Sequence, residues 1–332
     1  MPDAAARDIP RPRLIDRLRA GEPAALARAL TLVETGGADA QTLLRQVHDG
    51  QHTDPARHAV VVGFTGPPGA GKSTLISAYI RTLRGEGRTV AALAVDPSSP
   101  KSGGAILGGR ARMGEHAVDP GVFIRSLAAR GHLGGLTLNI HALVDVVGGA
   151  GWDAIVLETV GTGQSEIEVA RVADVTVVIS APGLGDEVQA MKAGILEIAD
   201  VLVVNKADLP GAARTEQQLG TMLHLRPDDA PEVPVVRTVA TDGDGLEDLV
   251  AAVDTRAATI TPAERAQRAR AHAADLIAEA AARRVRDQFR GPDAAALDTL
   301  SLRLLAGEID ADEAARLALD ALWGEHGEAA LS

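Results

Sequence analysis

The sequence predicts an α/β fold, in which a doubly wound, mainly parallel sheet lies between helices and carries helical extensions at both ends. Short continuous apolar runs alternate with helical patterns through the middle of the chain, which is typical of strands buried on both faces. Before and after this region, apolar residues recur only at helical spacing. The candidate strands are 59–64, 89–95, 153–159, 175–180, 201–205 and 234–240. We therefore expect an N-terminal helical arm (1–55), an α/β domain (56–260) and a C-terminal helical extension (261–332).

The composition restricts the classes of function. With 332 residues and 46% hydrophobic content the chain can bury a full core, and its net charge of −12 gives no cationic field for nucleic acid or an anionic membrane. We expect neither as a partner. No apolar run approaches the ~20 residues of a membrane-spanning helix, and the first residues do not resemble a signal peptide, so we expect a cytoplasmic protein. The absence of cysteine excludes disulfides and thiolate chemistry.

A phosphate-binding motif follows the first candidate strand. Residues 66–73, "GPPGAGKS", match G-x-x-x-x-G-K-[ST], with a strand before them and a helix after them. The glycines let backbone N–H groups and the helix N-terminus point at phosphate oxygens. Lys72 would add a positive charge near the β and γ phosphates, and the Ser73 hydroxyl would be available to Mg²⁺. This motif predicts a P-loop NTPase.

The fifth candidate strand ends in "NKAD", which indicates the base that is bound. The Asp208 carboxylate can accept hydrogen bonds from N1–H and the exocyclic amine of guanine, and the Lys206 stem can cover the base. Adenine would leave that carboxylate unpaired, so Asn205, Lys206 and Asp208 predict GTP and GDP rather than ATP. Alternatively, Asp208 caps a helix. The base-covering loop "TVATDGDG" is degenerate, and we assign Ala240 to it.

Two acidic residues end neighbouring candidate strands and are the expected metal-side carboxylates. Asp96 ends the second strand, and Glu158 begins "ETVG", which reads as D-x-x-G with one methylene added. Both could hold Mg²⁺ or its waters, while Gly161 offers its amide to the γ-phosphate. Gln164 either orients the attacking water or is an exposed polar residue of a loop. Glu158 could alternatively be a paired carboxylate that holds the sheet edge.

Several longer strings carry a resemblance to a known family. They are "VDPSSPKSGGAILGGRARM", "FIRSLAARGHLGGLT", "ETVGTGQSE" and "GDEVQAMKAGILEIADVLVVNKAD", together with the phosphate loop. Over essentially its whole length the chain resembles the MeaB/ArgK family of P-loop GTPases. The resemblance implies a GTP-dependent chaperone that gates cofactor delivery to an adenosylcobalamin-dependent acyl-CoA mutase, such as methylmalonyl-CoA mutase, and protects that mutase. It also implies a homodimer joined through the C-terminal helices.

The resemblance also implies roles for individual residues. The segment 185–192 would relay the nucleotide state to the mutase, with Asp186, Glu187, Gln189 and Lys192 as the residues to test; by periodicity alone it is a solvated helix start. Ser73, Asp96 and Glu158 would hold the metal. The motifs and the resemblance together give the expected nucleotide contacts, which are Gly66, Gly69, Ala70, Gly71, Lys72, Ser73, Thr74, Gly161, Asn205, Lys206, Asp208 and Ala240.

One position departs from the family pattern. The family usually reads L-G-D-[KR]-x-R-M where this chain has Gly109 in place of the aspartate. If that aspartate approaches the metal, this chain hydrolyses GTP more slowly or depends more on its partner.

Two other classes of function share the fold. A metal-insertion GTPase needs soft or imidazole ligands, but the nine histidines are dispersed and cysteine is absent. A kinase of an amino-acid transport system needs an acceptor base, for which no motif is present. The D-x-H-x-x-G cobalamin signature is also absent, so any cobalamin would be carried by the partner.

Overall fold

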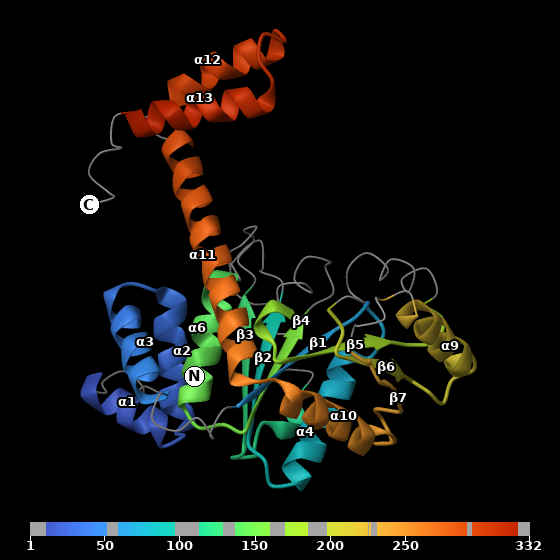
Figure 1. Cartoon of the computed structure of the whole chain (residues 1–332). Helices are drawn as coiled ribbons and strands as arrows, with labels where there is room; N and C mark the ends of the chain where they lie inside the picture. Colours follow the sequence, from blue (N-terminus) through green and yellow to red (C-terminus); the bar gives the residue numbers. More distant parts are fainter. Residues whose placement is uncertain are drawn as a thin grey trace. The chain divides into compact units, whose positions relative to one another are not determined.

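The computed structural model describes residues 11–51, 59–96, 113–128, 137–159, 170–184, 198–224, 226, 231–290 and 294–324. The described part of the chain divides into two compact units, with the division between Arg268 and Ala269. The first unit contains a sheet with helices on both of its faces (Figure 1). None of the helices in the described residues is long and apolar enough to cross a membrane.

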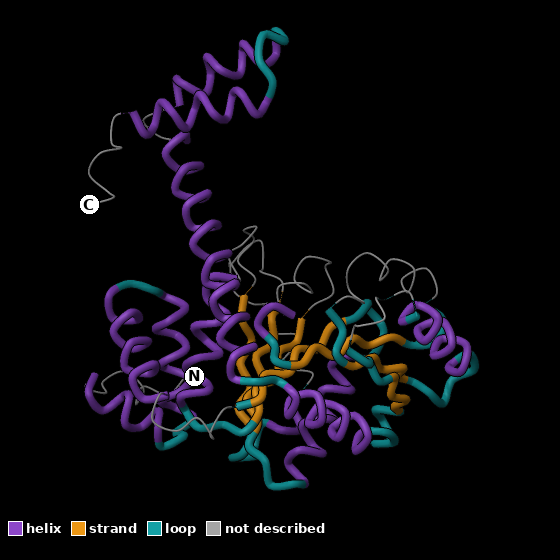
Figure 2. The backbone as a smooth tube through the Cα atoms, in the orientation of Figure 1, coloured by secondary structure: helices purple, strands orange, loops and turns teal. Residues whose placement is uncertain are grey.

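The sheet has seven strands in the order β3-β2-β4-β1-β5-β6-β7, and all paired neighbours are parallel. Figure 2 shows the strands in orange, with helices in purple around them. This topology confirms the predicted doubly wound α/β fold. Because the strands are parallel, the carboxyl ends of β1, β2, β4, β5 and β6 lie at one edge of the sheet, where such folds bind ligands. The strands are β1 (Val60–Thr65), β2 (Val90–Asp96), β3 (Val122–Ala128), β4 (Ala154–Thr159), β5 (Val175–Ser180), β6 (Val201–Asn205) and β7 (Val235–Thr238).

The prediction of six strands was wrong, because β3 was missed. This edge strand places Phe123, Arg125 and Leu127 on one face, and Arg125 breaks the continuous apolar run that marks the interior strands. The guanidinium of Arg125 contacts α2 (Pro23–Thr35), where it donates to the Ala27 carbonyl at 3.2 Å and pairs with Glu34. A charged residue is therefore accommodated in a strand because a neighbouring helix supplies its partners.

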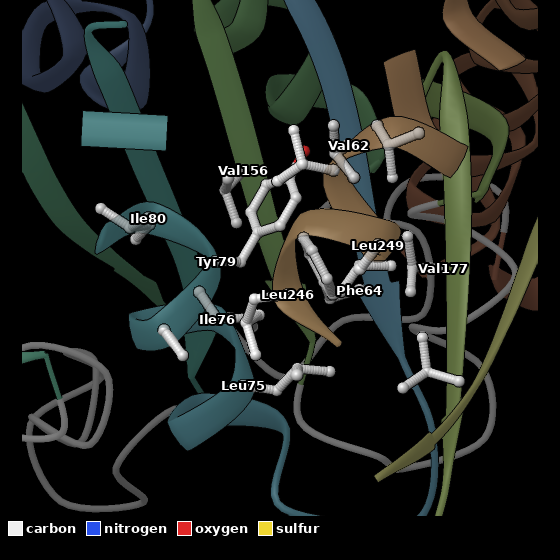
Figure 3. Packing of buried hydrophobic residues seen from close by; sticks show 14 of the residues in the cluster. Val62, Phe64, Leu75, Ile76, Tyr79, Ile80, Val156, Val177, Leu246 and Leu249 are labelled. Carbon is white, nitrogen blue, oxygen red and sulfur yellow. The ribbon is translucent and has the colours of Figure 1, made fainter. Parts of the chain in front are cut away.

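Two helices cover one face of the sheet. Residues of α4 (Lys72–Gly85) and α10 (Leu246–Thr259) share a buried apolar cluster with alternate residues of β1, β4 and β5 (Figure 3). Within it, the rings of Phe64 and Tyr79 meet edge to face with centroids 5.2 Å apart. Complete burial raises the pKa of the Tyr79 phenol, so this side chain stays neutral. The cluster seats α4 firmly on the sheet.

The other face is covered by two groups of helices. The N-terminal helices α1 (Arg11–Arg19), α2 and α3 (Ala38–Gln51) pack with α6 (Thr137–Gly149) over β1, β2, β3 and β4. The helix α9 (Ala212–Leu223) packs over β5 and β6. The N-terminal helices thus share the core of the first unit, since they bury one face of the sheet.

The helix α11 (Pro262–Arg290) begins in the first unit. Arg268 donates to the Asp174 carbonyl at 3.1 Å, and Arg265 pairs with the Asp174 carboxylate at 3.4 Å, so the first turns of α11 are fixed to the start of β5. In the second unit, α12 (Ala294–Leu305) and α13 (Ala311–Gly324) pack side by side (Figure 1).

Candidate nucleotide-binding site

The phosphate loop leaves β1 at Thr65 and enters α4 at Lys72. Gly66 and Gly71 have positive φ values of 145° and 88°. A Cβ atom at Gly66 would lie 2.2 Å from the Ile179 carbonyl oxygen, and one at Gly71 would lie 2.5 Å from the Asn205 amide nitrogen. The loop therefore needs glycine at both positions, because it passes against β5 and β6 at contact distance.

Two lysines contact the phosphate loop. The Lys72 ammonium donates to the carbonyl oxygens of Gly66 and Pro67 at 2.6 and 3.0 Å. The Lys206 ammonium donates to the Gly69 carbonyl at 2.8 Å. Two positive charges thus lie at the N-terminus of α4, where the helix dipole and the first N–H groups also favour an anion. Thr74 lies in the first turn of the same helix and is exposed.

A hydroxyl and a carboxylate meet beside this helix N-terminus. The Ser73 hydroxyl donates to Oε1 of Glu158, which is 3% exposed and lies opposite Phe64 on β1 and Ala94 on β2. Hydroxyl and carboxylate oxygens are hard ligands of the kind that Mg²⁺ prefers, so the donor set fits this ion. The structure thus brings together two of the three residues that the sequence assigned to the metal.

The third metal-side residue, Asp96, is the last residue of β2. The backbones of β2 and β4 pair up to Val95 and Thr159, so Asp96 and Glu158 belong to adjacent strand ends. The orientation of the Asp96 side chain lies outside the described structure. The same holds for Gly109, Gly161, Gln164 and the segment 185–192, which fall outside the described residues.

Asn205 connects the phosphate loop to the loop after β7. Its amide donates to the Ala70 carbonyl at 2.9 Å, and its oxygen accepts hydrogen bonds from the Thr238 hydroxyl at 3.1 Å and the Ala240 N–H at 3.3 Å. The side chain is 1% exposed. Asn205, which the sequence assigned to the base, therefore braces the two loops that flank the nucleotide site.

The residues after Asn205 turn back towards the loop. Lys206 is the only non-glycine residue with positive φ among the described residues, at 56°, and this conformation accompanies its contact with Gly69. Asp208 is exposed two residues further on. Thr238 was missed by the sequence reasoning. Its signal is positional, since Thr238 is the register partner of Asn205 at the end of the adjacent strand.

The parallel sheet, the glycine-dependent phosphate loop and the paired Ser73 and Glu158 define a P-loop nucleoside triphosphatase. Residues 26–293 match the family described as "Methylmalonyl Co-A mutase-associated GTPase MeaB". The chain belongs to the MeaB family, and it is a GTPase.

Two relatives carry GTPase names, and a solved structure shares the fold. The chain is 46% identical to a putative GTPase of Pyrococcus abyssi over 240 residues, which are 71% of this chain and 72% of the relative. It is 45% identical to GTPase ArgK of Escherichia coli over 194 residues, 58% of each chain. A crystal structure described as LAO/AO transport system kinase superposes with a TM-score of 0.72 at 26% identity and covers 97% of this chain and 99% of that chain.

Proposed function

We propose that this GTPase is a chaperone for an adenosylcobalamin-dependent acyl-CoA mutase of the methylmalonyl-CoA mutase type. In this role it gates the loading of the cofactor into the mutase and protects the mutase from inactivation. The observation that carries the proposal is the family match over residues 26–293, because the description of that family names association with this mutase. We further propose that the protein works in the cytoplasm.

The proposed hydrolysis mechanism rests on positioning and charge. Lys72 and the first N–H groups of α4 would hold the β and γ phosphates, and Ser73, Asp96 and Glu158 would hold Mg²⁺, which would supply positive charge to the phosphate oxygens when bound. Support comes from the Ser73–Glu158 contact and from the two lysines at the phosphate loop. Gly161 would then contact the γ-phosphate, and Gln164 would orient the attacking water.

Base selection is assigned to the end of β6. Asp208 would accept hydrogen bonds from guanine, and the stem of Lys206 would cover the ring beside the backbone of Ala240. The exposure of Asp208 and the braced backbone around Asn205 support this proposal, because a rigid loop can present a fixed acceptor to the base.

We propose a homodimer joined through the C-terminal extension, residues 261–332. Large apolar side chains are exposed there, at 71% for Ile277, 69% for Leu302 and 84% for Leu305, which is unfavourable unless they are covered. Sedimentation of the full chain and of residues 1–268 tests this. A dimer that persists without residues 269–332 would contradict it.

The communication with the mutase is assigned to the segment 185–192, with Asp186, Glu187, Gln189 and Lys192 as contact residues. Gly109, at the position of the family aspartate, would make hydrolysis either slower or more dependent on the mutase. Both proposals rest on the sequence strings of the MeaB family.

The first experiment is affinity capture from native lysate with the full chain, run in parallel with GDP and with a non-hydrolysable GTP analogue. We expect a cobalamin-dependent mutase to be recovered in an amount that depends on the nucleotide, and we expect this dependence to disappear in Lys72→Ala. Recovery of no mutase in either arm would contradict the chaperone proposal.

The transport-kinase description of the solved structure at 26% identity gives a second candidate, which the same lysate can test. GTP labelled at the γ-phosphate releases labelled inorganic phosphate if the chain is a hydrolase. Label transferred to a transport binding protein would instead favour the kinase.

A further inference from the structure

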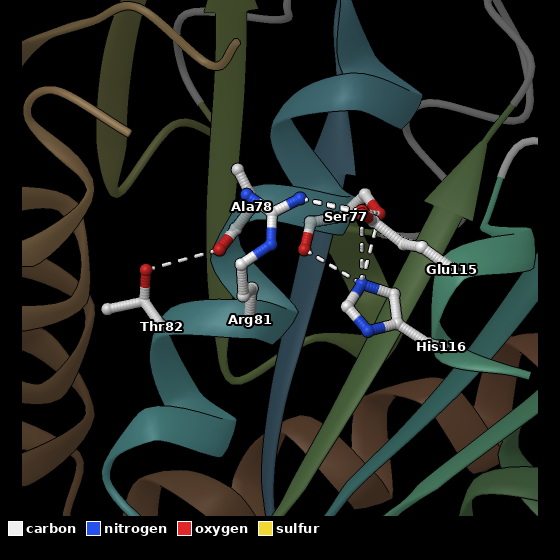
Figure 4. Close-up of polar contacts among 6 residues, drawn as sticks. All are labelled: Ser77, Ala78, Arg81, Thr82, Glu115 and His116. Carbon is white, nitrogen blue, oxygen red and sulfur yellow. Dashed lines mark hydrogen bonds and ion pairs between the residues drawn. The ribbon is translucent and has the colours of Figure 1, made fainter. Parts of the chain in front are cut away.

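The helix α4 carries a line of polar residues on one side. Ser73, Ser77 and Arg81 follow one another at intervals of four residues, so they lie on the same side of the helix. The first of them meets Glu158 at the nucleotide site. The other two meet Glu115 in the 3₁₀-helix η2 (Gly114–His116), which precedes β3 (Figure 4). One side of the helix is therefore held by two glutamates from two different elements.

The contacts around Glu115 form a compact cluster. Arg81 donates to both Glu115 oxygens at 2.8 Å, and the Ser77 hydroxyl donates to Oε1. His116 Nε2 lies 3.0 Å from both the hydroxyl and the carbonyl oxygen of Ser77. The Ser77 hydrogen bond, followed by that of Arg81, holds the pKa of Glu115 below its usual value, so the carboxylate is ionised at neutral pH.

This cluster is not a nucleophilic triad. Ser77 and Glu115 both approach the same ring nitrogen of His116, so the imidazole cannot pass a proton from one to the other. Ser77 is also only 5% exposed, which leaves its hydroxyl inaccessible to a substrate. The cluster can only hold elements together.

Packing places η2 directly on α4. Met113, just before η2, is fully buried in the same apolar cluster as Leu75, Ile76 and Tyr79, and His116 is 6% exposed. A second bidentate pair, between Arg84 and Asp119, joins the same two parts of the chain further from the phosphate loop.

We propose that Glu115 is a positioning residue for GTP hydrolysis, which holds α4 through Ser77 and Arg81 so that Ser73 stays in register with Glu158. This inference rests on the proposed role of Ser73 and Glu158 in holding Mg²⁺. Arg81 and Glu115 are about half exposed, so their pair adds little to the stability of the fold. A shift of α4 would, however, displace Ser73 and Lys72 together, and catalysis is sensitive to displacements of about 1 Å.

The test measures kcat and KM for GTP hydrolysis, GDP affinity and the thermal midpoint for Glu115→Gln and Arg81→Met in the full chain. We expect kcat to fall about tenfold in each, with KM and GDP affinity changed less than about twofold. Arg81→Lys, which keeps the charge, should recover part of kcat. The matched control is Asp119→Asn, which breaks the other arginine–carboxylate pair of α4 and should leave kcat unchanged.

The outcomes separate positioning from stability. Unchanged kcat in Glu115→Gln and Arg81→Met, or the same loss in Asp119→Asn, would overturn the proposal. A tenfold fall in kcat that comes with a tenfold loss of GDP affinity and a lowered thermal midpoint would also overturn it. Such a result would show that the cluster only stabilises the fold.

Discussion

Among single residues, Asn205 shows how one buried amide can determine the shape of a site. It satisfies the carbonyl of Ala70 with its donor and binds Thr238 and the Ala240 N–H with its acceptor. Because both ends of the amide are used within the protein, a change in its donor or acceptor character leaves a buried group without a partner. Asp208, three residues later, is exposed and carries no such constraint.

Asn205→Asp and Asp208→Asn should therefore have different effects. The first replaces a donor by a carboxylate facing the Ala70 carbonyl, and we expect GDP and GTP affinity to fall by at least about tenfold, since lost buried hydrogen bonds cost about 1–3 kcal/mol. The second should keep the fold and lose the preference for guanine over other purines. Competition binding with GDP, IDP, XDP and ADP measures both. Retained guanine selectivity in Asp208→Asn would refute the base assignment.

At the scale of the element, the phosphate loop is shaped by the strands that it passes. Gly66 meets the carbonyl of Ile179 on β5, and Gly71 meets Asn205 on β6. Gly69 also has positive φ, but a Cβ atom there would find no neighbour within 4 Å. The three glycines of the loop thus have different roles. Gly66 and Gly71 allow the loop to approach the sheet closely, whereas Gly69 is needed only for its backbone conformation.

This difference predicts the effects of alanine at two positions. Gly69→Ala should cost about 1–2 kcal/mol of unfolding free energy, which is the usual cost of a left-handed alanine. Gly66→Ala should cost more and should also weaken GDP binding, because the loop must move away from β5. Urea unfolding and GDP titration of the two variants provide the comparison. Equal losses in both variants would mean that the contact with Ile179 does not shape the loop.

At the scale of the whole molecule, several carboxyl groups have a lower pKa in the folded protein than they ordinarily have. Hydrogen bonds lower the pKa of Glu115, Asp119 and Glu264 below the ordinary values of these carboxyl groups, with Ser77, Arg84 and Thr261 as the first causes, respectively. A lowered folded-state pKa means that the unfolded chain binds protons first as the pH falls. These groups therefore stabilise the fold above their usual pKa values and cease to do so in acid.

The free energy of unfolding should be nearly level from about pH 7 to about pH 5 and fall below about pH 4.5. Urea unfolding across this range measures it. Glu264→Gln should reduce the loss of unfolding free energy below about pH 4.5. The amide cannot titrate, although it can still accept the hydrogen bond of the Thr261 N–H. If the combined variant Glu115→Gln, Asp119→Asn and Glu264→Gln loses as much unfolding free energy in acid as the unmodified protein, other carboxylates cause that loss.

Much of the fold follows from the sequence alone. The interior strands are recognisable because each is buried on both faces and therefore reads as a continuous apolar run, as in "VLVVN" of β6. The phosphate loop is recognisable because glycine, lysine and serine must stand at set intervals to surround a phosphate. Local physical requirements of this kind leave a local pattern, so the α/β fold and the GTPase class could be predicted.

Other features depended on the tertiary structure. β3 was not predicted, because Arg125 is tolerated in a strand only where α2 supplies its partners. That helix is almost a hundred residues earlier in the chain. The bracing role of Asn205 depends on strand register with Thr238, and the cluster around Glu115 depends on the seating of η2 on α4. In each case the partner comes from a distant part of the sequence, and no local pattern records it. The sequence by itself thus determined which chemistry this protein performs, whereas only the packing decided which residues hold that chemistry in place.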